Sequence, residues 1–180
     1  MNAMKGGPFE FRIMGTDELV AKSDSTMFEG SNTSFQVHLQ VSPDRFVEQY
    51  NLAQLITAPL LAACTNSPLL LGRRLWHETR IALFQQSVDV RKHSYTASEE
   101  KPRVSFGDQW LEESVVNVYK ENISRHRVLL IHPNPEDALS VLEKGRIPDL
   151  QALQIHNGTV YTWNRACYGV TDGIPHLRIE

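Results

Sequence analysis

Residues 34–41 carry polar and apolar side chains at alternate positions, and Gln36 and His38 are among the polar ones. In a β-strand, residues two apart point to the same face of the sheet. An amide oxygen and an imidazole on one face can together bind a metal ion or a nucleotide, or they can simply face solvent, as on many half-exposed strands. The segment therefore predicts a strand with one candidate binding face.

Cationic and polar side chains gather at two further places in the sequence. Arg73 and Arg80 follow the turn residue Gly72, and guanidinium groups bind carboxylates and phosphates through paired hydrogen bonds. A solvated basic face is the alternative interpretation. A second set lies along a predicted late hairpin, where polar residues otherwise face water. That set comprises His156, Thr159, Arg165, Arg178 and Glu180.

Composition and missing motifs exclude several classes of protein. The sequence has no Gly-rich phosphate loop, no Gly-x-Ser-x-Gly elbow and no His-Glu-x-x-His motif. A formal net charge of -3 over 180 residues gives no basic footprint for nucleic acid or an anionic membrane, and no run of 18 apolar residues is present to span a bilayer. Without a signal region we expect a cytoplasmic protein, with Cys64 and Cys167 as reduced core residues.

Periodicity and turn chemistry predict the elements that position these side chains. Alternation predicts strands over residues 9–14 and 34–41, and Ser42 with Pro43 begins a largely buried helix that ends near Cys64. Strands, long helices and a late hairpin in this order indicate an α+β fold with an antiparallel sheet backed by helices. The other expected elements are loops over 15–33 and 91–103, helices over 76–88, 108–122 and 136–144, a turn over 156–158, a strand over 159–163, and a turn over 171–173 before a last strand.

The two ends of the sequence suggest how the domain is bounded. Residues 1–7 read as a lead-in, and residues 8–180 as a single, partial domain. The last seven residues alternate like a strand in progress, whereas domains usually end in loosely held polar residues. We therefore expect a fragment whose open strand edge and uncovered apolar face lead to a homo-oligomer, specifically a dimer.

Four blocks of the sequence, in order, resemble the glutamate–cysteine ligase family in its bacterial carboxylate–amine ligase branch. Each block matches a family strand or turn, and together they span residues 33–180. The blocks are Thr33-Ser34-Phe35-Gln36-Val37-His38-Leu39-Gln40; Asn66-Ser67-Pro68 with Gly72-Arg73 and Arg80; His156 with Thr159 and Arg165; and Leu177-Arg178-Ile179-Glu180.

The resemblance implies a curved antiparallel sheet similar to that of glutamine synthetase and an ATP- and magnesium-dependent reaction. In that reaction a glutamate-like carboxylate becomes an acyl phosphate, which an amine then attacks. Magnesium prefers hard oxygen ligands, and cations stabilise phosphoryl transfer. By resemblance, Glu180 and His38 are metal ligands, and the catalytic residues are Arg73, Arg80 and Arg165. The nucleotide- or substrate-binding residues are Gln36, His38, His156 and Thr159.

The sequence departs from the family pattern at three positions. Gln36 replaces a histidine, Glu10 lies outside the context of the family's Glu-x-Glu strand, and the sequence ends before an arginine expected two residues after Glu180. We therefore expect little activity from this chain alone. A non-catalytic binding module that keeps the ligase scaffold is the alternative, and a metal-dependent hydrolase is a third, less supported one.

Overall fold

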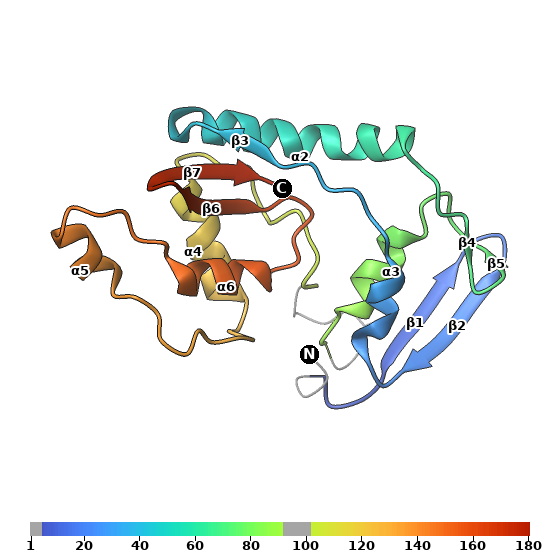
Figure 1. Cartoon of the computed structure of the whole chain (residues 1–180). Helices are drawn as coiled ribbons and strands as arrows, with labels where there is room; N and C mark the ends of the chain where they lie inside the picture. Colours follow the sequence, from blue (N-terminus) through green and yellow to red (C-terminus); the bar gives the residue numbers. More distant parts are fainter. Residues whose placement is uncertain (1–4, 92–101) are drawn as a thin grey trace. The chain divides into compact units, whose positions relative to one another are not determined.

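The computed structural model describes residues 5–91 and 102–180, and its chain divides into two compact units. Unit 1 comprises Met1–Phe35 and Ala58–Ser105, and unit 2 comprises Gln36–Thr57 and Phe106–Glu180. Figure 1 shows the elements along the chain.

Unit 1 is built on an antiparallel hairpin of β1 (Phe9–Met14) and β2 (Glu18–Ser23). Alternate residues of β1 point into a core that the short helix α3 (Arg80–Ser87) covers from one side. The unit also contains the 3-10 helix η1 (Thr26–Ser31) and a small hairpin of β4 (Leu69–Leu70) and β5 (Arg73–Arg74). The buried core residues are Phe9, Phe11, Ile13, Leu19, Leu75, Ala82 and Leu83.

Unit 2 contains a three-stranded antiparallel sheet in which β7 lies between its two neighbours (Figure 1). The strands are β3 (Leu39–Val41), β6 (Ala166–Thr171) and β7 (Ile174–Ile179). Helices α2 (Phe46–Ala63) and α4 (Val115–Arg125) pack on one face of this sheet. The short 3-10 helix η2 (Pro43–Arg45) precedes α2, and α5 (Ala138–Glu143) and α6 (Gln151–Gly158) precede the hairpin.

The register of unit 2 separates an apolar face of the sheet from a polar one. Val41 pairs with Leu177 and Ile179 with Ala166, and these side chains join the core beneath α2 and α4. On the opposite face, Arg178 pairs with Cys167 and with the exposed Gln40. The predicted fold class is thus confirmed at the level of a mixed α+β fold with antiparallel sheets backed by helices.

Several predicted elements are right in kind but differ in extent. The strand over 9–14 is confirmed as β1, and the turn over 171–173 and the last strand are confirmed within the β6–β7 hairpin, whose first strand lies at 166–171 rather than 159–163. The helices expected over 76–88, 108–122 and 136–144 are shorter or shifted. Most of the loop expected over 91–103 lies outside the described residues. Only residues 39–41 of the strand expected over 34–41 form a ladder, and Phe35 and Val37 are exposed.

Five predictions are wrong. The expected loop over 15–33 contains β2, whose inward residues Leu19 and Ala21 pair across the hairpin despite the polar surroundings. The turn expected over 156–158 and the strand over 159–163 are replaced by α6 and an irregular segment. Helix α2 buries Phe46 and Tyr50 but exposes much of its remaining apolar surface, and Cys64 is exposed rather than in the core.

Among the residues that the structure describes, no helix is both long enough and apolar enough to cross a bilayer.

Candidate functional site

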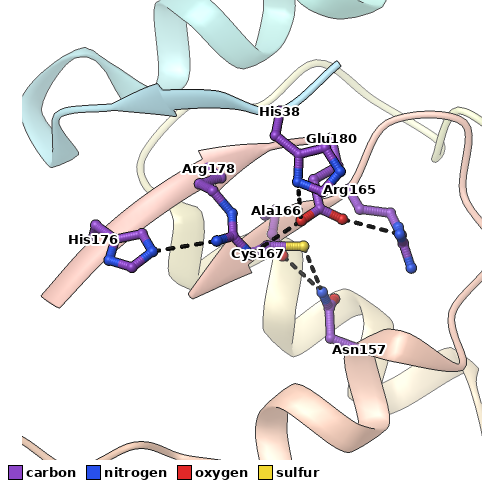
Figure 2. A network of polar contacts seen from close by, with 8 residues as sticks. All are labelled: His38, Asn157, Arg165, Ala166, Cys167, His176, Arg178 and Glu180. Atoms are coloured by element: carbon purple, nitrogen blue, oxygen red, sulfur yellow. Dashed lines mark hydrogen bonds and ion pairs between the residues drawn. The ribbon is translucent and has the colours of Figure 1, made fainter. Parts of the chain in front are cut away.

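The carboxylate of Glu180 is the centre of a polar cluster on the open face of the unit 2 sheet (Figure 2). Arg165 Nη2 donates a hydrogen bond to Glu180 Oε2 at 3.0 Å. The other oxygen, Oε1, accepts a hydrogen bond from Arg178 Nη2 at 3.2 Å and lies 3.1 Å from His38 Nδ1. The Cys167 thiol lies beside the same carboxylate. We call these five residues the Glu180 cluster.

The cluster is cationic and Glu180 is almost fully enclosed. Two guanidinium groups face one carboxylate, so the cluster carries a net charge of +1 while His38 is neutral. The Glu180 side chain is only 7% exposed, whereas Arg165 and Arg178 remain partly open to solvent. Glu180 therefore holds the two arginines in place, and their remaining Nη N–H groups, unlike the buried Nε of Arg178, are left for an anionic ligand.

Backbone pairing and the half-buried Asn164 place Arg165 at this point. Its N–H donates to the Glu180 carbonyl at 2.8 Å, and the Glu180 N–H donates back at 3.0 Å. The preceding residue, Asn164, is tied to α2: its Nδ2 donates to Gln54 Oε1 at 2.7 Å and to Thr57 Oγ1 at 3.0 Å. The Tyr50 hydroxyl donates to the Asn164 carbonyl at 3.2 Å. The chain around Arg165 is therefore fixed before any ligand arrives.

Cys167 and Asn157 form the inner border of the cluster. Asn157 Nδ2 donates to the Ala166 carbonyl at 2.9 Å and contacts Cys167 Sγ at 3.3 Å (Figure 2). A side chain of α6 thus provides a hydrogen-bond donor to a backbone carbonyl of the edge strand β6. Burial, reinforced by the Glu180 carboxylate, raises the pKa of the Cys167 thiol to about 11. Burial, with Cys167 and Glu180 nearby, also raises the pKa of Tyr119. The thiol is therefore protonated near neutral pH and acts as a donor rather than a nucleophile.

Replacing Glu180 by glutamine should make Cys167 more reactive. The change removes the negative charge that helps raise the thiol pKa, although burial remains, so we expect alkylation at fixed pH to accelerate by up to about tenfold. Iodoacetamide labelling followed by mass spectrometry measures this rate. The exposed Cys64 is the internal control and should keep its rate. Equal Cys167 rates in both proteins would contradict the coupling.

His176 extends the polar face beyond the Glu180 cluster. Its Nε2 lies 3.4 Å from Arg178 Nη1, and its ring lies over Gly169 on the neighbouring strand (Figure 2). A Cβ added to Gly169 would be 2.8 Å from that Nε2, so the ring fits only because residue 169 is glycine.

Gly169→Ala should displace His176 from Arg178. Because the obstacle is the end of a flexible side chain, we expect a stability change below about 1 kcal/mol together with a changed His176 ring environment. A ¹H–¹⁵N spectrum of the histidine rings reports the displacement. Gly158→Ala, where an added Cβ meets nothing within 4 Å, is the control. An unmoved His176 signal in the Gly169 variant would refute the predicted displacement.

The structure brings together four of the residues singled out from the sequence: His38, Arg165, Arg178 and Glu180. Gln36 is exposed and makes no side-chain hydrogen bond within the described residues. His156 and Thr159 are buried at the end of α6. His156 Nε2 lies 2.9 Å from the His126 carbonyl, and Thr159 Oγ1 donates to the His156 carbonyl at 2.8 Å.

The other two predicted catalytic arginines belong to unit 1. Arg73 is exposed on β5, next to the tight turn of the β4–β5 hairpin. Arg80, the first residue of α3, forms a bidentate ion pair with Glu78. That guanidinium holds the pKa of Glu78 down at about 2, and hydrogen bonds from Ser67 and Asn66 add to the effect.

The donor set does not fit a magnesium ion held by this chain's own side chains. Within residues 5–91 and 102–180, no group of three or more His, Cys, Asp or Glu side chains is arranged to hold a metal ion. Glu180 is the one carboxylate of its cluster and is already paired with two arginines. Magnesium prefers several hard oxygen ligands, so it needs oxygen atoms from elsewhere, such as substrate phosphates.

Sequence reasoning missed Cys167, Asn157, Asn164 and His176 as parts of this region. The alternation of β6 and β7 signals that Cys167 and His176 share a face with Glu180 once the register of the hairpin is known. Asn157 and Asn164 reach the site from α6 and an irregular segment, and only the packing of those segments shows their contacts.

Comparison with known proteins agrees with the resemblance seen in the sequence. Residues 12–170 match the family described as glutamate-cysteine ligase family 2 (GCS2). No curated protein and no solved structure matches the chain. The matched range covers most of both units and includes Arg73, Arg80 and Arg165. The chain therefore belongs to glutamate-cysteine ligase family 2.

Proposed function

We propose that this protein serves as an ATP-dependent carboxylate–amine ligase that joins a glutamate-like carboxylate to an amine. Membership of glutamate-cysteine ligase family 2 carries the proposal. The γ-phosphoryl group of ATP passes to the carboxylate to give an acyl phosphate and ADP. The amine then attacks the acyl carbon, and phosphate leaves. A curved sheet similar to that of glutamine synthetase is part of the same proposal.

The Glu180 cluster supplies groups suited to this chemistry. Phosphoryl and acyl transfer depend on cations that stabilise the charge developing on oxygen atoms. Arg165 and Arg178 are held by Glu180 with N–H groups to spare, and His38 adds a further nitrogen on the same face. In this proposal the two arginines bind the phosphate or carboxylate oxygens of the substrates, and Glu180 keeps them oriented.

Magnesium enters the proposal with the nucleotide rather than through a site built by this chain. Magnesium commonly keeps several waters and is held by substrate phosphates with one or two carboxylates. Because even nucleotide-bound magnesium takes one or two protein carboxylates and the described residues assemble no metal-holding group, we expect the 180-residue chain alone to turn over little ATP.

An assay of ADP release tests the proposal. The full-length protein is incubated with ATP, magnesium, glutamate and a panel of amines that includes cysteine. We expect ADP formation that requires both the carboxylate and the amine. Nucleotide binding without turnover under any combination would instead favour a non-catalytic module that keeps the ligase scaffold. Release of ADP that is indifferent to the amine would contradict a ligase.

A further inference from the structure

The carboxylate of Glu78 is fixed by the turn that precedes the β4–β5 hairpin. Glu78 is only 4% exposed, Ser67 Oγ donates to its Oε1 at 2.5 Å, and the Asn66 N–H donates to Oε2 at 3.4 Å. Backbone bonds tie the same two segments together, because Ser67 N–H donates to the His77 carbonyl and Thr79 N–H to the Ser67 carbonyl, each at 3.1 Å. Glu78 thus has little freedom to move.

Glu78 in turn fixes Arg80. The Arg80 Nε donates to Glu78 Oε1 at 2.5 Å and Nη2 to Oε2 at 2.9 Å, which holds the guanidinium in the plane of the carboxylate. Its third nitrogen, Nη1, donates to the Thr33 carbonyl at 2.7 Å. All three nitrogens of the guanidinium therefore have a partner within unit 1.

Arg80 nevertheless keeps part of its hydrogen-bonding capacity. A guanidinium has five N–H groups. Three are used by Glu78 and Thr33, which leaves one on each Nη without a partner in the described residues. The Arg80 side chain is 27% exposed, so these groups can be reached from solvent.

We infer that Glu78, held by Ser67, is a positioning residue that presents the two unused N–H groups of Arg80 to an oxyanion of the substrate. The inference rests on the proposed function, since it assigns Arg80 to the carboxylate or phosphate that such a ligase handles. Because the Glu78–Arg80 pair is neutral overall, directed hydrogen bonds rather than net charge recognise the oxyanion. Planar or tetrahedral oxyanions are thereby favoured over simple halides.

Nuclear magnetic resonance of the arginine Nε–H groups tests the inference in the full-length protein. Glutamate and inorganic phosphate are added separately, with chloride as the reference anion. We expect one of the two probes to shift the Arg80 signal saturably, and the probe that does so identifies a carboxylate or a phosphoryl subsite. The unfolding free energy of each variant is measured alongside, because a merely structural role changes stability without changing the affinity at Arg80.

Two variants test whether the position of the Glu78 carboxylate matters independently of its charge. Glu78→Asp keeps the negative charge but shortens the side chain by one methylene, so the carboxylate cannot hold both Ser67 and the guanidinium. We therefore expect the affinity of the probe anion for Arg80 to fall by about tenfold. Ser67→Ala removes one hydrogen bond to Glu78 and should lower the affinity by about threefold. If Glu78→Asp does not fold, Ser67→Ala decides. The control is Glu18→Asp, which shortens the acidic side chain of the exposed pair with Arg12 by one methylene and should leave the affinity unchanged.

The outcomes distinguish this inference from the proposed function. Unchanged affinity in a folded Glu78→Asp or Ser67→Ala variant overturns the positioning role and leaves the ligase proposal standing. An Arg80 signal that neither probe moves also overturns the inference, whatever the ADP assay gives. Failure of the ADP assay with a saturable, Glu78-dependent Arg80 shift would instead refute the ligase and keep an oxyanion site.

Discussion

Glu78→Gln is expected to lower the free energy of unfolding at pH 7 by about 3 kcal/mol. The pKa of Glu78 lies at about 2 against an ordinary value of 4.5, chiefly because Arg80 donates two hydrogen bonds to the carboxylate. Each pKa unit corresponds to about 1.4 kcal/mol of differential interaction between the protonation states. The amide of glutamine keeps the size of the side chain but presents one N–H₂ group to a guanidinium that needs acceptors. Urea unfolding followed by circular dichroism measures the loss.

The same pair gives stability a defined dependence on pH. A carboxyl group whose pKa is lowered by folding stabilises the protein fully above its ordinary pKa, and loses that effect as the pH falls through the folded value. The Glu78 contribution should therefore be complete above about pH 4.5 and should disappear toward pH 2. The Gln variant should lack this component. Glu18→Gln, on the exposed pair with Arg12, should change the unfolding free energy by less than about 0.5 kcal/mol. Parallel pH profiles for wild type and Glu78→Gln would refute the assignment.

Arg165→Ala is expected to reduce kcat of the proposed ligase reaction by about 10²- to 10³-fold, the scale associated with losing one group that stabilises transition-state charge. Arg165 is fixed by its backbone pairing with Glu180 and by its side-chain contact to Oε2. Arg165→Lys retains the charge without the planar fork and should recover only part of the rate. Steady-state ADP release in the full-length protein measures both effects.

A matched control for Arg165 lies in the same unit. Arg45 forms an exposed ion pair with Glu48 at the start of α2, so Arg45→Ala should leave kcat unchanged. Stability must be compared as well, since Arg165→Ala leaves Glu180 with fewer partners. A variant that is folded and fully active without Arg165 would remove this residue from the catalytic groups.

Local features of the fold were predictable where neighbouring residues in the sequence allow only one local structure. The alternation of residues 9–14 produces β1, and Asp172-Gly173 closes the β6–β7 hairpin with both residues at positive φ. His156-Asn157-Gly158 carries a similar turn signal, yet it ends α6 instead. There the Asn157 side chain hydrogen-bonds to β6, and this tertiary contact outweighs the local preference.

The sequence by itself determined the α+β class, the strand β1, the turn and last strand of the β6–β7 hairpin, and the chemical types gathered at the candidate site. It also carried the pattern that identifies glutamate-cysteine ligase family 2. The tertiary structure decided which of those groups meet. His38 and Glu180 are separated by most of the chain, and only the pairing of β3 with β7 places them 3.1 Å apart. An ion pair forms between groups that are close in space, and the number of residues between two groups does not determine how close they are in the fold. For the same reason the sequence could not show that Arg80 and Glu180, singled out for substrate and metal, are each held by a charged partner within their own unit.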